Sequence, residues 1–180
     1  QNYSIEHSIY SDILALYMRE KETKKLTVGS KAPHFSLEDE NGYIHTLKDQ
    51  IGKWILLYFY PKDDTPGCTK EACAIRDTFP HFKKLNVTVF GVSADSMQSH
   101  EKFKEKYKIP FTLLSDPTKT TIEAYGAWGE KSFMGKKFDG ILRTSFLIDP
   151  SGNIAKIYEK VKPKEHAEEV LADMKILTTG

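Results

Sequence analysis

The chain of 180 residues is poor in cysteine, with only Cys68 and Cys73. Small secreted proteins that rely on disulfides normally carry more cysteines at wider spacing, so the sequence does not fit that class. Two cysteines five positions apart close too short a loop to stabilise a fold appreciably. We therefore interpret them as residues with a chemical role.

Long apolar runs and an excess of charge of one sign are also missing. The longest apolar run covers residues 54–60, whereas a bilayer-spanning helix needs roughly 20 apolar residues. The 26 basic and 25 acidic side chains leave a formal charge of +1, although proteins that neutralise many phosphates usually carry a basic excess. We expect neither a membrane nor a nucleic acid as partner.

No signal peptide, with a basic start followed by an apolar core, opens the chain. We therefore expect a cytoplasmic protein, or an organellar one whose targeting segment precedes Gln1.

Two segments differ in character. Residues 1–25 are predicted to form an N-terminal helical extension, because apolar residues recur there at helical spacing; these are Ile5, Ile9, Ile13, Leu16 and Tyr17. This helix either folds back on its own domain or contacts a second copy or a partner. Residues 26–180 are long enough to form one domain with a substantial core.

An α/β pattern begins near Lys31. The dipeptide Asn41-Gly42 indicates a hairpin turn between short strands at 35–37 and 43–47. Further strands are predicted at 54–60, 87–92, 111–114, 144–148 and 154–158, and helices at 68–84, 96–107, 118–125 and 163–177. Strands and helices alternate in the middle and a second hairpin comes late, which predicts a mixed central sheet flanked by helices. This order fits a thioredoxin-like fold with an N-terminal β-hairpin.

The segment between the strand at 54–60 and the helix at 68–84 holds the most chemistry. Pro66 and Gly67 break the chain before Cys68, which places that cysteine at the start of the helix. The free N–H groups and the dipole of a helix N-terminus favour the thiolate, the nucleophilic form of cysteine. Active sites of open α/β sheets lie at such strand ends. We therefore expect Cys68 to be a nucleophile.

Thr65 and Pro61, which precede Cys68 in the sequence, also suit a site for a nucleophilic cysteine. Thr65 offers a hydroxyl that can donate to the sulfur or orient a substrate oxygen. Pro61 supplies a rigid apolar wall without an N–H group.

Cys73 follows one and a half helical turns after Cys68. Five residues of an ideal helix give a rise of about 7.5 Å and a rotation of about 140°. The two Cα atoms would then lie roughly 8–9 Å apart, beyond the ~7 Å limit for a disulfide. If these cysteines react with each other, the helix between them must unwind first.

A cation beside the sulfur would stabilise a thiolate further. Arg143 opens the strand at 144–148 and can project toward Cys68 from a neighbouring strand, while Arg76 lies on the helix that carries both cysteines. The sequence leaves the choice between these two arginines open.

These motifs resemble a known family. Pro61, Thr65 and Cys68 match the Pro-x-x-x-Thr-x-x-Cys signature of the peroxiredoxins. The presence of a second cysteine, Cys73, five positions after Cys68 resembles the pattern of the peroxiredoxin Q / bacterioferritin comigratory protein subfamily. The sequences of residues 128–135 and 143–149 resemble that subfamily too. The resemblance runs from about Lys25 to the C-terminus.

The resemblance implies a thioredoxin-dependent thiol peroxidase. Cys68 would attack a hydroperoxide and become a sulfenic acid, with Thr65 hydrogen-bonding the reacting atoms, Pro61 excluding water and Arg143 stabilising the charge. Cys73 would resolve the sulfenic acid into a disulfide, which thioredoxin or a similar dithiol would reduce. The resemblance implies no metal or other cofactor, and a monomer or weak dimer.

Three alternatives remain at this stage. A thiol–disulfide oxidoreductase normally has two residues between its cysteines, as Cys-x-x-Cys, whereas four residues separate Cys68 from Cys73 here. A metal-binding thioredoxin-like module would need a third soft or imidazole ligand near the cysteines, and no histidine lies in 120–145. A non-catalytic interaction through the N-terminal helix is compatible with the peroxidase.

Overall fold

The computed structural model describes residues 25–179. The predicted helix at 1–25 lies outside the described residues, apart from Lys25. No helix within the described part of the chain is both long and apolar enough to cross a bilayer.

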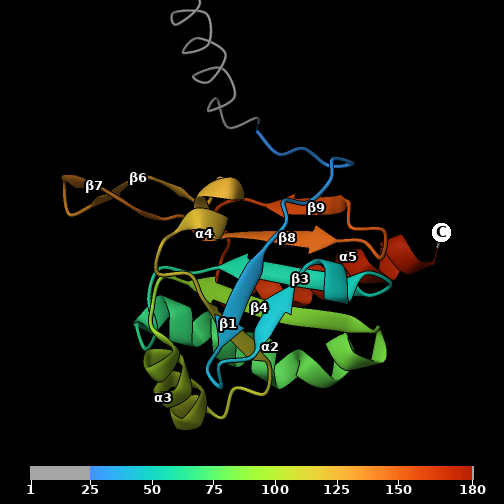
Figure 1. The fold of residues 1–180 in the computed structure, drawn as a ribbon, viewed down its shortest axis with the longest axis horizontal. Helices are drawn as coiled ribbons and strands as arrows, with labels where there is room; N and C mark the ends of the chain where they lie inside the picture. Colours follow the sequence, from blue (N-terminus) through green and yellow to red (C-terminus); the bar gives the residue numbers. More distant parts are fainter. Residues whose placement is uncertain (1–24, 180) are drawn as a thin grey trace, which may run out of the picture.

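A seven-stranded mixed sheet forms the centre of the fold, in the order β2-β1-β5-β4-β3-β8-β9 (Figure 1). Its strands are β1 (Ser36–Asp39), β2 (Ile44–Thr46), β3 (Trp54–Phe59), β4 (Val87–Ser93), β5 (Thr112–Ser115), β8 (Thr144–Ile148) and β9 (Ile154–Tyr158). β3 pairs parallel to β4 and antiparallel to β8, so the predicted mixed sheet is confirmed.

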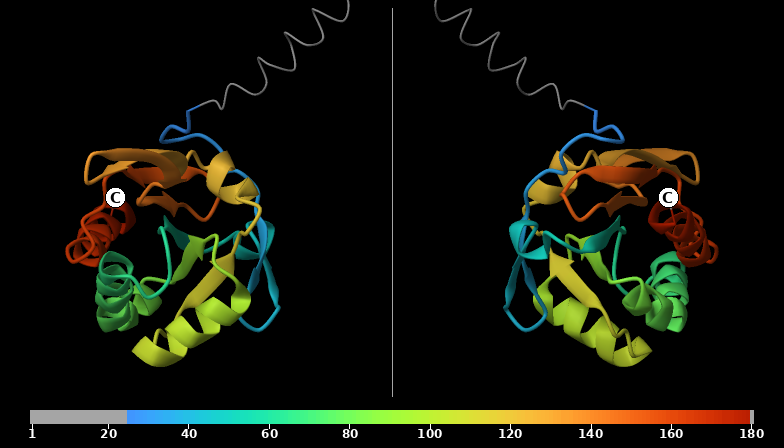
Figure 2. Two further views of the ribbon diagram at one scale, coloured as in Figure 1. Left: turned by 90° about the vertical axis from the view of Figure 1, so that its left-hand side faces the viewer. Right: turned by 90° about the vertical axis from the view of Figure 1, so that its right-hand side faces the viewer.

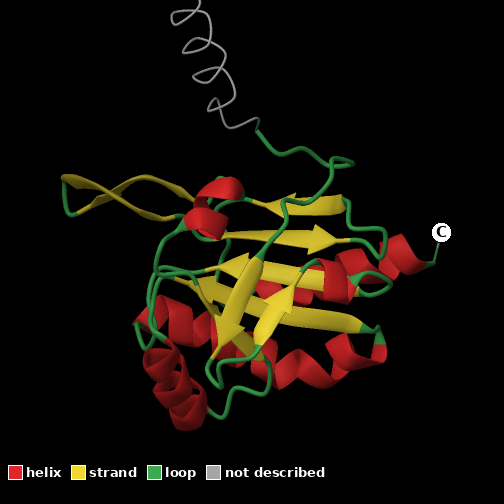
Figure 3. Cartoon of the chain, in the orientation of Figure 1, coloured by secondary structure: helices red, strands yellow, loops and turns green. Residues whose placement is uncertain are grey.

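The helices lie on both faces of this sheet (Figure 2). They are the 3-10 helix η1 (Lys48–Gln50) and the α-helices α2 (Pro66–Lys84), α3 (Met97–Tyr107), α4 (Thr120–Ala124) and α5 (His166–Thr178). α2 and α5 lie side by side on one face, where α3 also contributes to the core, and the short α4 lies on the other face. Helices and strands are thus layered as the alternating pattern predicts (Figure 3).

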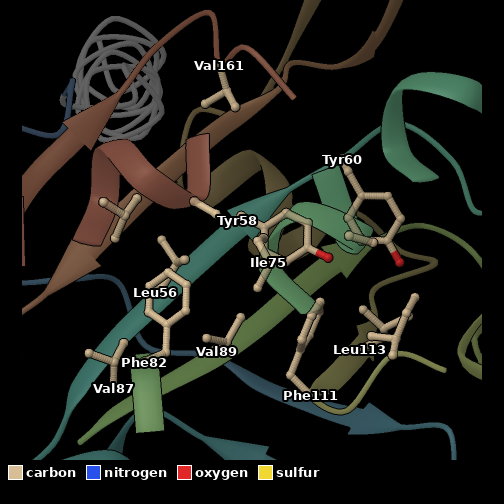
Figure 4. Close-up of a cluster of buried hydrophobic side chains, with 14 of the residues drawn as sticks. Leu56, Tyr58, Tyr60, Ile75, Phe82, Val87, Val89, Phe111, Leu113 and Val161 are labelled. Carbon is tan, nitrogen blue, oxygen red and sulfur yellow. The ribbon is translucent and has the colours of Figure 1, made fainter. Parts of the chain in front are cut away.

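Two hydrophobic cores result from the alternation of side chains along β3. Leu56 and Tyr58 point toward α2 and α5, into the cluster drawn in Figure 4. Ile55, Leu57 and Phe59 point to the opposite face, against residues such as Phe35, Ile122 and Tyr125. Because both faces are covered, β3 is a continuous apolar run.

The N-terminal hairpin forms where the Asn41-Gly42 dipeptide predicts it. Gly42 has φ of 80°, a left-handed conformation that favours glycine. β1 pairs antiparallel with β2 and also with β5, so the hairpin extends the main sheet.

The late hairpin predicted from strands 144–148 and 154–158 is confirmed, because β8 pairs antiparallel with β9. A further hairpin was not predicted. β6 (Trp128–Phe133) and β7 (Lys136–Ile141) form a separate two-stranded antiparallel sheet that projects from the body (Figures 1 and 3). Met134 and Gly135 form its turn with φ of 50° and 78°, as two-residue hairpin turns require.

Smaller differences concern helix boundaries. α5 begins at His166, because the stretch around Pro163 forms a turn before the helix. α4 covers 120–124 within the predicted 118–125, and α2 begins two residues before Cys68.

Candidate active site

The segment from the end of β3 to the start of α2 places Cys68 as predicted. Thr65 is the N-cap of α2 with extended backbone, and Pro66 occupies the first turn, where a missing N–H costs nothing. Cys68 therefore lies in the first turn of the helix, and its side chain is buried in the core beneath α2.

Arg143 is the cation that contacts the sulfur. Its Nη2 atom lies 3.4 Å from Sγ of Cys68. The register of the sheet explains this contact, because Thr144 of β8 pairs with Phe59, the last residue of β3. Arg143 thus lies beside the point where the chain leaves β3 for α2.

Gly67 leaves room for this guanidinium. A Cβ atom at position 67 would lie 3.1 Å from Nη2 of Arg143, tighter than nearly all contacts of that kind. The glycine before Cys68 therefore serves the approach of Arg143 as well as the chain break.

Arg76, the other candidate, points elsewhere. Its Nε donates to Asp77 at 2.9 Å and its Nη1 donates to the carbonyl of Tyr107 at 2.6 Å. Of the two arginines left open by the sequence, Arg143 is the one that reaches Cys68.

Glu71 completes the site and was missed by the sequence reasoning. Its side chain is fully buried, and one carboxylate oxygen forms an ion pair with Nη1 of Arg143. The other oxygen, Oε1, has no hydrogen-bond partner among the described residues. Glu71 lies three residues after Cys68, a spacing that puts both on one helix face, so the signal was present.

The electrostatics of this pair follow from burial. Burial raises the pKa of Glu71 to about 7, although the charge and hydrogen bond of Arg143 act in the opposite direction. Burial also opposes the charged form of Arg143, but the nearby Glu71 and Cys68 outweigh it and raise the pKa of the guanidinium. Arg143 thus stays charged while Glu71 titrates near neutral pH.

Thr65 is close to the site but bonded to the backbone. Its hydroxyl donates to the carbonyl of Lys62 at 2.9 Å. Within the described residues it forms no hydrogen bond with the Cys68 sulfur, so one of the two roles expected of Thr65 is not seen here. Its oxygen can still accept a hydrogen bond, and its role toward a substrate stays a prediction.

Pro61 lines a cavity next to the site. This cavity has a volume of about 660 Å³, and Arg143, Thr144 and Lys131 also border it. Pro61 and Arg143 thus border the same cavity, and the role of Pro61 as a wall that excludes water stays a prediction.

Cys73 is half-buried on the same uninterrupted helix as Cys68, and both thiols are free. Cys68 belongs to the buried core cluster and Cys73 does not. This arrangement matches the regular helix in which the two sulfurs cannot join. No group of three or more His, Cys, Asp or Glu side chains suited to a metal ion lies within residues 25–179.

Known proteins share both the sequence and the fold. Residues 28–157 match the sequence profile of the AhpC/TSA family. Peroxiredoxin Bcp of Escherichia coli strain K12 is 47% identical over 146 residues, which cover 81% of this chain and 94% of the relative. Peroxiredoxin Bcp of Bacillus subtilis strain 168 is 46% identical over 150 residues, covering 83% of this chain and 96% of the relative.

A solved structure agrees with these relatives. The bacterioferritin comigratory protein of Xanthomonas campestris has a TM-score of 0.78 and 35% sequence identity, covering 84% of this chain and 99% of that one. The resemblance and the thioredoxin-like fold inferred from the sequence are thereby confirmed. The chain belongs to the AhpC/TSA family and, within it, to the peroxiredoxins of the Bcp / peroxiredoxin Q type.

Proposed function

We propose that this peroxiredoxin reduces hydrogen peroxide and alkyl hydroperoxides with Cys68 as the attacking thiolate. The contact of 3.4 Å between Nη2 of Arg143 and Sγ of Cys68, in the first turn of α2, carries this proposal. The solved Xanthomonas campestris relative is described with an alkyl peroxide reduction activity, which supports the substrate class.

In the first step the sulfur attacks one oxygen of the O–O bond. The bond breaks, Cys68 becomes a sulfenic acid, and the other oxygen leaves as an alkoxide that takes up a proton to form the alcohol. Arg143 is placed to stabilise the thiolate and the negative charge that develops on the leaving oxygen. The Glu71 carboxylate holds the guanidinium in position through an ion pair with Nη1 of Arg143.

Thr65 and Pro61 would act on the peroxide. The Thr65 oxygen can accept a hydrogen bond from the protonated peroxide oxygen while its own hydroxyl continues to donate to the Lys62 carbonyl. Pro61 borders the neighbouring cavity without adding a polar N–H group.

In the second step Cys73 resolves the sulfenic acid. Its thiolate attacks the sulfur of Cys68, the S–O bond breaks, and a Cys68–Cys73 disulfide forms while the hydroxide that leaves takes up a proton to become water. The regular helix through both residues cannot accommodate this bond, so the segment between them must unwind.

Thioredoxin, or a dithiol protein like it, would then return both cysteines to thiols. The unwinding that allows the disulfide to form also exposes it to this reductant. A monomer or weak dimer and a cytoplasmic location remain part of the proposal. Sedimentation and cell fractionation test these two points.

The main competing function is thiol–disulfide oxidoreduction. The five-residue spacing within one regular helix favours the peroxidase, because Cys-x-x-Cys pairs form their disulfide at a helix start without unwinding.

Peroxide consumption and insulin reduction, measured with the same thioredoxin supply, distinguish the two functions. We expect wild type to consume hydroperoxide, Cys68→Ser to be inactive, and Cys73→Ser to turn over slowly or not at all with thioredoxin. Efficient insulin reduction without peroxide consumption would contradict the proposal.

A further inference from the structure

The end of α3 contacts the cysteine segment, which we define as residues 64–76, on both sides of the two cysteines. No part of the proposed chemistry uses these contacts. They involve Asp64 at the start of the segment and Arg76 at its end, and they meet at Tyr107.

At the start of the segment, Asp64 accepts two hydrogen bonds. The Tyr107 hydroxyl donates to Oδ1 at 2.6 Å, and Nζ of Lys106 donates to Oδ2 at 2.7 Å. Asp64 has φ of 53°, a left-handed conformation that is uncommon for non-glycine residues but that aspartate tolerates better than most. The two bonds hold the turn that leads into α2.

At the end of the segment, Nη1 of Arg76 donates to the backbone carbonyl of Tyr107 at 2.6 Å. The ring of Tyr107 packs edge-on against buried Phe103, with centroids 5.4 Å apart, which fixes the residue on α3. A single residue of α3 therefore bonds both ends of the segment that must unwind.

The residue just before the segment is held in a different way. Asp63 accepts hydrogen bonds from Tyr60 at 2.7 Å and Ser99 at 2.7 Å, and its Oδ2 lies 2.8 Å from Nδ1 of His100. The side chains of Asp63 and His100 are 4% and 0% exposed, whereas those of Asp64 and Lys106 are 43% and 57% exposed.

Because of this difference in burial, the hydrogen bonds of Asp63 are harder to break than those of Asp64. Water can replace the exposed bonds of Asp64 at little cost, but the buried bonds of Asp63 have no such substitute. The chain can open from residue 64 onward while Asp63 keeps the preceding loop in place.

We propose that Tyr107 is a positioning residue that holds the cysteine segment helical and thereby sets the rate of disulfide formation. This inference rests on the proposed Cys68–Cys73 disulfide. Release of Tyr107 from Asp64 and Arg76 allows the segment to unwind, and Cys73 then reaches Cys68.

A consequence concerns overoxidation. While the segment stays helical, the sulfenic acid can attack a second hydroperoxide: the O–O bond breaks, one oxygen is transferred to the sulfur to give a sulfinic acid, and the other leaves as the alcohol. Tyr107 thus sets the competition between disulfide formation and sulfinic acid formation.

Tyr107→Phe is the most direct test, since it removes the hydroxyl and keeps the ring and the carbonyl. Asp64→Asn is a second variant that weakens the same contact from the other side and tolerates the left-handed backbone. Tyr158→Phe is the matched control, because it removes a hydroxyl that donates to Asp173 at 2.8 Å, far from the cysteine segment in the sequence.

Rapid mixing with hydroperoxide separates sulfenic acid formation from disulfide formation. We expect Tyr107→Phe and Asp64→Asn to accelerate disulfide formation about twofold to fivefold, the size expected for one partly exposed hydrogen bond. The rate of the first step should not change, the sulfinic acid fraction at high peroxide should fall, and Tyr158→Phe should match wild type in all three.

Hydrogen exchange of the reduced proteins gives a readout that needs no peroxide. Faster exchange confined to 64–76 in Tyr107→Phe supports the inference, whereas lower overall stability with an unchanged disulfide rate would show a merely structural role and overturn it. Failure of wild type to form a Cys68–Cys73 disulfide would instead overturn the proposed function, and the inference with it.

Discussion

Arg143 contacts Cys68 across 75 positions of sequence, with Nη2 of the arginine 3.4 Å from the sulfur. The antiparallel pairing of β8 with β3 brings the two residues together, and Gly67 leaves the space for the guanidinium. Glu71 holds the other guanidinium nitrogen from the same helix as Cys68. The peroxidase site therefore lies where the pairing of β8 with β3 brings Arg143 next to the start of α2.

Replacing Arg143 by Met should slow the reaction of Cys68 with hydroperoxide by roughly 10- to 100-fold. Hydrogen bonds to charged groups contribute about 1.5–3 kcal/mol, and each 1.36 kcal/mol corresponds to a factor of ten in rate. Stopped-flow kinetics with hydroperoxide measure this effect.

Arg76→Met is the control for this prediction, because Arg76 bonds Asp77 and Tyr107 rather than the sulfur. A larger loss of the peroxide step in Arg76→Met than in Arg143→Met would transfer the electrostatic role to Arg76.

Glu71 should make stability depend on pH in a defined direction. Its pKa in the folded protein is about 7, above the ordinary value of 4.5, so the folded state binds the proton more tightly than the unfolded state. Stability should therefore be lost as the pH rises from about 4.5 through 7, by on the order of 3 kcal/mol from this group. Glu71→Gln should not show this loss.

Urea denaturation at several pH values, for wild type and Glu71→Gln, measures this difference. The stability of the variant relative to wild type should increase between pH 5 and 8. A constant difference over this range would mean that Glu71 does not titrate there.

The buried bonds of Asp63 should contribute much more to stability than the exposed bonds of Asp64. Asp63→Ala leaves the donors of Tyr60, Ser99 and His100 without their acceptor inside the protein, which should cost about 3–5 kcal/mol. Asp64→Ala, at an exposed position, should be clearly milder. Equal shifts of the urea midpoint for the two variants would contradict this reading of their burial.

The segment between the cysteines should reorganise on oxidation. Reduced protein should protect the amides of 68–76 from hydrogen exchange, since α2 is continuous there. The disulfide form should lose this protection, because a regular helix keeps the two Cα atoms beyond bridging range. Equal protection in forms whose redox state is verified by mass would refute the unwinding step and indicate a different partner for Cys73.

Much of the fold could be predicted because strong local signals agree with the tertiary structure. The apolar run at 54–60 is the central strand, and Pro66 with Gly67 marks the start of α2. The β6–β7 hairpin was missed because its residues are mostly exposed, and its apolar and polar side chains do not alternate as they do in a half-buried strand.

The site was predicted less completely, for two physical reasons. A glutamate such as Glu71 is usually on the surface, and only the tertiary packing shows that it is buried against Arg143. The choice of Arg143 over Arg76 depends on which strand lies next to β3, and no local pattern carries that information.

The central claim, that Cys68 is the nucleophile and Cys73 the resolving residue, is tested most directly in a single turnover. Cys73→Ser and Cys68→Ser are each treated with one equivalent of hydroperoxide in the presence of dimedone, and the labelled peptide is located by mass spectrometry. We predict a dimedone adduct on Cys68 in Cys73→Ser and none on Cys73 in Cys68→Ser, because Arg143 contacts the sulfur of Cys68 and, among the described residues, makes no such contact with Cys73. An adduct on Cys73 in Cys68→Ser, together with an unreactive Cys73→Ser, would reverse the two roles and contradict the account.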